Sequence, residues 1–203
     1  MGNNMNKQQF LTRFILQRTA LGEPNPLIPQ NTHFQQKRQL KQAAVLMPLV
    51  QRENGLQILF TQRALHLKHH PGQVSFPGGK YENTDSSLAF TALRETEEEV
   101  GINQNNIQLL GHLPSLTTTS GYHVTPFIGF VKEMQPLIID YNEVKVCFEV
   151  PFSFLLNPHN FSKQHLTANK KRHFTYCCAH QNHFIWGATA LMIINLQRHL
   201  FSV

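Results

Sequence analysis

The chain has 203 residues, of which 41% are apolar and 15% charged. This composition excludes a disordered chain and a coiled coil, and the length suits one domain with a sizeable core. No run of about 18 apolar residues occurs, and the N-terminus lacks a secretory signal pattern, so we expect neither a membrane span nor export. Three cysteines, two of them adjacent, make a poor disulfide framework and favour a cytoplasmic location.

The formal net charge is +6, yet the acidic residues are not evenly spread. Five of the 12 acidic residues lie between residues 85 and 99. An acidic segment in a basic chain is typical of a protein that uses a divalent cation to handle a polyanion. Scattered surface charge is the alternative interpretation.

Hydrophobic spacing and turn residues predict the elements in chain order. They are a helix over residues 5–18, a Pro- and Asn-rich linker over 22–31, strands over 43–50 and 57–63, a Pro/Gly loop over 71–82, a helix over 86–100, strands over 107–113, 124–131 and 144–150, and a helix over 185–201. Strands on both sides of a central helix predict an α/β layered domain. We divide the chain into an N-terminal helix and linker (1–40), a main domain (41–172) and a C-terminal strand and helix packed on the same domain (173–203).

The helix over 86–100 carries an unusual set of acidic residues. Asp85 is the expected N-cap and Gly101 the expected C-terminal stop. At 100° per residue, Glu95, Glu98 and Glu99 share an arc of about 100°, whereas Glu97 falls on the far side. Like charges at this spacing, near the negative end of the helix dipole, are unfavourable without a cation. The three carboxylates therefore predict a metal site, with a solvated acidic face as the alternative.

Residues 79–102 resemble the Nudix box, G-x5-E-x7-R-E-U-x-E-E-x-G-U, in which U is a bulky apolar residue. The run RETEEEVGI (94–102) matches the end of that pattern, except that Thr96 replaces U. One extra residue separates Gly79 from Arg94, and Asp85 stands where the first Glu is expected.

A second motif lies upstream of this box. Residues 59–64 (LFTQRA), Lys68, Gly72 and FPGG (76–79) resemble the coenzyme A pyrophosphatase branch of the Nudix hydrolases. Lys68 replaces an arginine of that pattern, which keeps the charge and loses bidentate phosphate binding. The likeness covers most of residues 41–190. It implies the Nudix α/β/α sandwich with a mixed sheet, extended by the N-terminal and C-terminal helices.

The resemblance also implies a role for each matching residue. Glu95 and Glu99 become ligands of Mg²⁺ or Mn²⁺, with Glu98 beside them. Arg94 is expected to pair with a loop carbonyl or carboxylate. Glu143 is the candidate general base, since Nudix enzymes often recruit a carboxylate from a later loop; an ordinary exposed glutamate is the alternative. The predicted catalytic residues are Glu98, Glu143 and Arg94, and the predicted substrate-binding residues are Arg63, Lys68, Gly79 and Lys80.

The activity implied is metal-dependent hydrolysis of the pyrophosphate bond of coenzyme A or its thioesters, which yields 3′,5′-ADP and 4′-phosphopantetheine or its acyl derivative. One alternative is another nucleoside diphosphate derivative, such as ADP-ribose, a dinucleotide or a capped RNA end. A non-catalytic nucleotide-binding Nudix module and a basic RNA-binding protein are further alternatives. The expected partner is a small molecule rather than a nucleic acid or a membrane, and a homodimer stays open.

Overall fold

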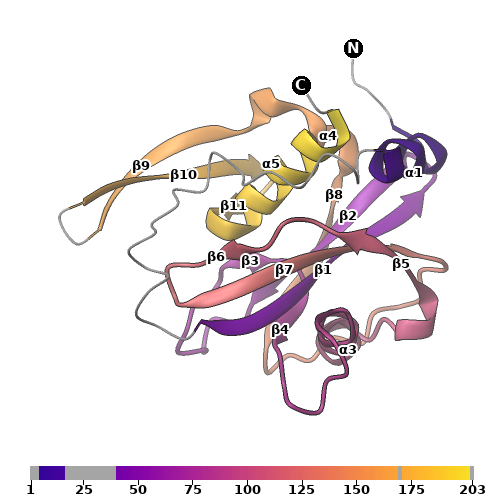
Figure 1. Ribbon diagram of the computed structural model, residues 1–203, viewed down its shortest axis with the longest axis horizontal. Coiled ribbons are helices and arrows are strands. Elements are labelled where there is room, and N and C mark those ends of the chain that lie inside the picture. The colour runs from indigo at the N-terminus through magenta and orange to yellow at the C-terminus, as the bar shows by residue number, and fades with distance from the viewer. Residues whose placement is uncertain (1–4, 17–39, 169–170, 202–203) are drawn as a thin grey trace.

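The computed structural model describes residues 5–16, 40–168 and 171–201 (Figure 1). The linker predicted over residues 22–31 lies outside these ranges. The described chain forms two sheets and four α-helices. The larger sheet lies between α3 on one face and α5 with the smaller sheet on the other (Figure 1). No helix within the described ranges is both long and apolar enough to cross a membrane.

The eight-stranded sheet consists of β1 (Lys41–Arg52), β2 (Gly55–Arg63), β3 (Val74–Ser75), β4 (Gly78–Lys80), β5 (Ile107–His112), β6 (Leu116–Thr117), β7 (Tyr122–Val131) and β8 (Val144–Pro151). Its central path is β3-β2-β1-β7-β5, with β4 on β1, β6 on β7 and β8 on β2. Only the β1–β7 pair of this sheet is parallel among the described strands, so the sheet is mixed, as predicted. β1 lies at its centre, which explains its nearly continuous apolar run.

The smaller sheet has the order β11-β10-β9, built from β9 (Ser162–Ala168), β10 (Lys171–His180) and β11 (His183–Trp186). The helices are α1 (Lys7–Leu16), α3 (Leu88–Val100), α4 (Phe152–Leu156) and α5 (Gly187–Phe201), with short 3-10 turns η2 (Gln104–Asn106) and η3 (Pro158–Asn160). The predicted α/β sandwich with helical N- and C-terminal additions is confirmed.

Several details differ from the sequence prediction. The Pro/Gly loop contains the short strands β3 and β4, which are too brief to show a hydrophobic period. Strands β6 and β9 and helix α4 were not predicted. The strand expected after residue 172 begins earlier, at Lys171, so the domain boundary placed between residues 172 and 173 falls inside β10. Residues 185 and 186 belong to β11, because Gly187 turns the chain at φ 66° before α5 begins. Finally, α3 begins at Leu88 rather than at residue 86.

The N-terminal helix α1 is part of the main core. Phe10 and Phe14 are fully buried, and their rings stack with centroids 5.6 Å apart. Phe10 also meets Phe130 of the sheet edge-on, and Phe14 packs on His199 of α5 at 4.5 Å. Helix α1 is therefore held by aromatic packing against both the sheet and α5.

We predict that Phe14→Ala lowers the free energy of unfolding by about 3–5 kcal/mol, because it removes a fully buried ring. Ile15→Ala is the matched control in the same turn. Its side chain is 56% exposed, so the expected change is within about 0.5 kcal/mol. Urea unfolding of both variants measures the difference. Equal losses would show that α1 does not anchor through its aromatic face.

Candidate active site

The start of α3 is built differently from the sequence prediction. Asp85 is not the N-cap; Ser87 is, and its Oγ accepts a hydrogen bond of 3.1 Å from the backbone N–H of Phe90. The Asp85 side chain is turned inward instead and only 4% exposed. Its Oδ2 accepts from the Glu82 N–H at 3.0 Å and from the Thr91 hydroxyl at 2.8 Å. The Asp85 carboxylate thus forms hydrogen bonds inside the protein and does not cap the first turn of α3.

The main partner of Asp85 is Arg94. The guanidinium donates from Nε to Oδ1 at 2.9 Å and from Nη2 to Oδ2 at 3.1 Å, a two-pronged ion pair. Nη2 also lies 3.3 Å from the Lys80 carbonyl oxygen. Hydrogen bonding from Arg94 holds the pKa of the Asp85 carboxyl well below its usual range. Arg94 therefore contacts both a loop carbonyl and a loop carboxylate, the two kinds of partner expected from the sequence.

Arg94 also touches two carboxylates of its own helix. Its Nη2 lies 3.0 Å from Glu95 Oε1, and its Nη1 donates to Glu98 Oε2 at 2.8 Å. The Glu98 side chain is 58% exposed, so it lies at the outer rim of the group. One guanidinium thus stands among Asp85, Glu95 and Glu98, and the cluster keeps an excess of negative charge.

Glu99 is the most deeply buried carboxylate of α3, at 5% exposure. Its Oε2 accepts a hydrogen bond of 3.3 Å from the Gly78 N–H. The pKa of Glu99 is raised to about 8, mainly by burial and also by the negative charges of Glu95 and Glu143. The hydrogen bond from Gly78 and the charge of Arg63 oppose this shift. The charges of Glu95, Glu143 and Arg63 thus all affect the ionisation of Glu99.

Gly79 makes room for Glu95. It pairs with Ala44 of β1, and a Cβ atom built on it would clash with the Glu95 carboxyl group. Any larger residue at position 79 would push that carboxylate away from β4. Partial burial raises the pKa of Glu95, and the neighbouring Arg94 opposes this effect. The observed function of Gly79 is thus to leave space for Glu95, while its predicted substrate-binding role stays a prediction.

The donor set suits a hard divalent cation. Glu95 and Glu99 are desolvated carboxylates, and the charge of Glu95 disfavours ionisation of Glu99. Mg²⁺ and Mn²⁺ bind such oxygen ligands. In the described part of the chain, no three His, Cys, Asp or Glu side chains are gathered closely enough to hold a metal ion. Glu98 in particular is bound to Arg94.

Glu143 is exposed, and its charge acts on both Glu95 and Glu99, where it raises the pKa of each. The structure thus brings this loop residue to the α3 carboxylates. Lys68 and Lys80 are exposed, on the turn after β2 and at the end of β4. Glu97 lies apart from the cluster, as the helical period predicts, since its Oε1 accepts from Asn103 Nδ2 at 2.7 Å.

Sequence reasoning missed several neighbours of this site. His66 and Asn142 join the turn after β2 to the Glu143 loop, through a 3.1 Å hydrogen bond between His66 Nε2 and the Asn142 carbonyl. Asp140 caps the same loop by accepting from Asn142. The DYN run at 140–142 is a recognisable turn signal for the cap. The half-buried thiol of Cys147 is a further neighbour, since burial and the Glu99 charge raise the pKa of Cys147 to about 12.

Comparisons with known proteins extend over most of the chain. Residues 40–167 match the NUDIX domain family. The chain is 38% identical over 192 residues to a protein named uncharacterized Nudix hydrolase NudL from Yersinia pestis (strain Pestoides F), which covers 95% of this chain and 94% of that protein. The same values hold for the NudL of Yersinia pseudotuberculosis serotype O:1b (strain IP 31758).

Two solved structures are also similar. A C. elegans Ap4A hydrolase binary complex is 17% identical, with a TM-score of 0.47, over 54% of this chain and 80% of that chain. A MutT/nudix family protein from Enterococcus faecalis is 18% identical, with a TM-score of 0.48, over 90% of this chain and 63% of that chain.

We predict that the metal-free protein loses stability as pH rises, because of Glu99. Its pKa is raised on folding from 4.5 to about 8, so its contribution is fully present below 4.5 and lost as pH rises through 8. Thermal melts in a chelator should show the wild-type Tm falling relative to Glu99→Gln between pH 6 and 9. Added Mg²⁺ should raise the wild-type Tm most at the upper end of that range, since a ligand carboxylate must be ionised. A pH-independent difference between the two proteins would contradict the assignment.

Proposed function

Because the chain belongs to the Nudix hydrolase family, we propose that it hydrolyses the pyrophosphate bond of coenzyme A or its thioesters, with Mg²⁺ or Mn²⁺ as cofactor. The products would be 3′,5′-ADP and 4′-phosphopantetheine or its acyl derivative. One observation carries the proposal. Arg63, from the segment that resembles the coenzyme A branch, lies close enough to Glu99 for its charge to lower the pKa of that carboxyl. This proximity supports the proposal that the upstream motif and the acidic helix serve one site.

Each residue of the site has a proposed task. Glu95 and Glu99 hold the cation, with Glu98 at the rim and the Gly79 carbonyl as a further oxygen ligand. When bound, a divalent cation polarises phosphoryl oxygens and makes a bound water more acidic. Arg94 is fixed by Asp85 and keeps Glu95 and Glu98 in place.

Glu143 acts as the general base. Its carboxylate takes one proton from water as the water oxygen attacks one phosphorus, and the bond from that phosphorus to the bridging oxygen breaks. The bridging oxygen leaves on the second phosphate, and Glu143 returns its proton to solvent. A protonated carboxyl group at position 143 could not accept the proton of the attacking water. The negative charges of the substrate phosphates are bound by Arg63, Lys68 and Lys80.

The alternatives differ in substrate or in catalysis. Hydrolysis of another nucleoside diphosphate derivative, such as ADP-ribose, a dinucleotide or capped RNA, would use the same carboxylates. A non-catalytic nucleotide-binding module would not need them, whereas this chain keeps Glu95, Glu98 and Glu99 together with the Asp85–Arg94 pair. The three free cysteines are in keeping with a reducing cytoplasm, and a homodimer remains a prediction of the sequence.

We predict that Glu95→Gln and Glu99→Gln each lower kcat by about 100-fold or more, because each removes an anionic oxygen from the metal site, worth several kcal/mol in the transition state. Glu97→Gln is the matched control. It lies on the far side of the same helix and bonds to Asn103, so its kcat should be close to that of the wild type. Steady-state assays with Mg²⁺ measure all three. Wild-type turnover in Glu99→Gln would refute the metal assignment.

Substrate choice is tested with coenzyme A, dephospho-coenzyme A, ADP-ribose, NADH and diadenosine polyphosphates under one metal condition. A charge-assisted hydrogen bond to the 3′-phosphate contributes about 1.5–3 kcal/mol, so coenzyme A should exceed dephospho-coenzyme A in kcat/KM by roughly 10- to 150-fold. Added salt should shrink this advantage. Equal kcat/KM values for the two compounds would show that the enzyme does not recognise the 3′-phosphate. Faster cleavage of ADP-ribose or a dinucleotide than of coenzyme A would show that coenzyme A is not the preferred substrate.

A further inference from the structure

The backbone around Glu143 is held on both sides by hydrogen bonds. On the N-terminal side, the Glu143 N–H donates to the Asp140 carbonyl at 3.0 Å, and the Asn142 carbonyl bonds to His66 Nε2 at 3.1 Å. On the C-terminal side, the Glu143 carbonyl accepts from the Ala64 N–H at 2.8 Å, and the Val144 N–H donates to the Asp140 carbonyl at 2.9 Å. All four polar groups of the two peptide units flanking Glu143 are therefore paired.

The side chain of Glu143, by contrast, is exposed, and so are those of Asn142 and His66. An exposed glutamate on a mobile loop would sample many positions, whereas a general base must be held close to its productive geometry. The fixed backbone restricts where the carboxylate can reach. The base is thus directed by its peptide groups rather than by packing around its side chain.

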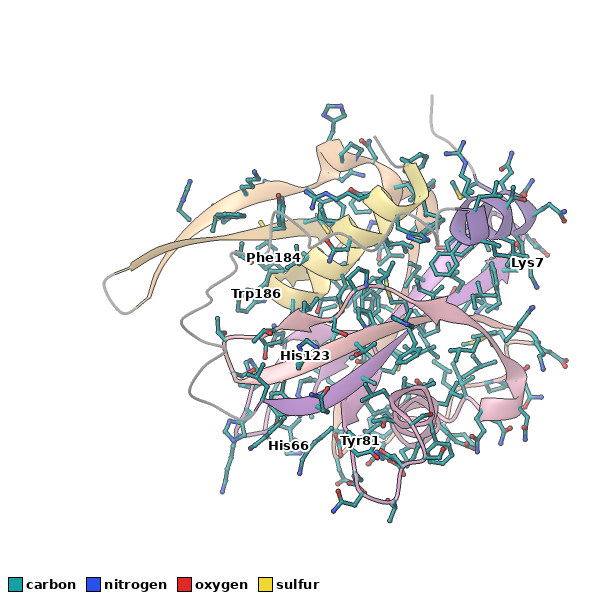
Figure 2. The ribbon with its side chains drawn as sticks, in the orientation of Figure 1. Lys7, His66, Tyr81, His123, Phe184 and Trp186 are labelled. Carbon is teal, nitrogen blue, oxygen red and sulfur yellow. The ribbon has the colours of Figure 1, made fainter. Side chains whose placement is uncertain are left out.

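Three of the four hydrogen bonds join backbone to backbone, and the fourth comes from the side chain of His66. A carbonyl oxygen can only accept, so His66 Nε2 must carry the hydrogen of this bond. His66 lies on the turn after β2, three residues beyond Arg63 (Figure 2). It therefore links the strand that carries the phosphate-binding Arg63 to the loop that carries Glu143.

The other side of the loop is fixed to α3. The Ile138 N–H donates to the Val100 carbonyl and the Asp140 N–H to the Glu99 carbonyl, both at 3.1 Å. These carbonyls belong to the last turn of the helix, where intrahelical partners are lacking. Gly101 keeps the approach open, since a Cβ there would lie 2.7 Å from Ile138 Cβ. The loop is thus attached at one end to the helix of the metal carboxylates and at the other to His66 and Ala64.

We propose that His66 is a positioning residue that sets the place of Glu143 relative to Glu99 through the Asn142 carbonyl. This inference rests on the proposed hydrolase function and on Glu143 as its base. His66 does not touch the reacting atoms. It completes a bridge from β2 to the loop, and without it the peptide unit before Glu143 keeps only its bond to Asp140.

The test compares His66→Ala, His66→Gln and His69→Ala in the full-length protein with Mg²⁺ and coenzyme A. His66→Ala should lower kcat roughly 10- to 100-fold, the loss expected when a catalytic group is displaced by up to about 1 Å, with KM nearly unchanged. His66→Gln should recover most of kcat, because its amide N–H can donate to the same carbonyl. His69→Ala, an exposed histidine of the same turn, should match the wild type.

A double-mutant cycle separates positioning from general stabilisation. If His66 acts through Glu143, His66→Ala should have little further effect on kcat in a Glu143→Gln background. Independent losses in the two positions would overturn the proposal, as would equal losses in His66→Ala and His66→Gln. A fall in Tm of His66→Ala that accounts for its lost activity would also overturn it.

Hydrogen–deuterium exchange gives a readout that needs no activity. The amide protons of Glu143 and Val144 should exchange faster in His66→Ala than in the wild type or His69→Ala. Unchanged exchange would refute the positioning role even if the protein is an active hydrolase. Faster exchange in a protein that cleaves no pyrophosphate substrate would retain the structural link and reject the proposed function instead.

Discussion

Like-charged carboxylates at the C-terminal end of α3 are the constraint around which the site is built. Glu95 and Glu99 face the sheet from a helix end where the dipole already disfavours negative charge, and Glu99 is almost fully buried. The chain accommodates them without filling the space near them. Gly78 offers a backbone N–H to Glu99, and Gly79 has no side chain to displace Glu95. The remaining charge imbalance is the property on which the proposed cation site depends.

The Asp85–Arg94 ion pair fixes the orientation of α3, and therefore of its carboxylates, relative to the sheet. Taking two charges out of water is costly, and such a pair is tolerable only when its hydrogen bonds are well satisfied. Here Asp85 accepts bonds from Arg94, Thr91 and Glu82, and Arg94 reaches the Lys80 carbonyl as well. The pair thereby connects the loop before α3, the strand β4 and the helix. Its main effect is to fix the helix in one rotation against β4, so that the acidic face meets the glycines.

Much of the fold and site could be predicted because it follows local periodicity. The helical period alone separated Glu97 from the other α3 acids, and the apolar run over residues 43–50 predicted the strand that is β1. The N-cap was missed because three candidate caps lie side by side at residues 85–87, and only the tertiary contact with Arg94 decides that Asp85 turns inward. β3 and β4 were missed because two or three residues carry no period. The role of His66 depends on a partner 76 residues away, which no local pattern records.

The acidic helix α3 and the loop that carries Glu143 are joined by hydrogen bonds, whereas the lysines near them are exposed. The last carbonyls of α3 accept from the 138–140 backbone, so the helix that presents Glu95 and Glu99 also anchors the loop of Glu143. The backbones of α3 and of the Glu143 loop therefore form one hydrogen-bonded unit. Lys68 and Lys80, in contrast, are exposed, on the turn after β2 and at the end of β4. Substitutions at such positions can alter which phosphate-bearing group is recognised without displacing the carboxylates. In the proposed hydrolase, this division separates the carboxylates of α3, which would perform the cleavage, from the exposed cations, which would select the substrate.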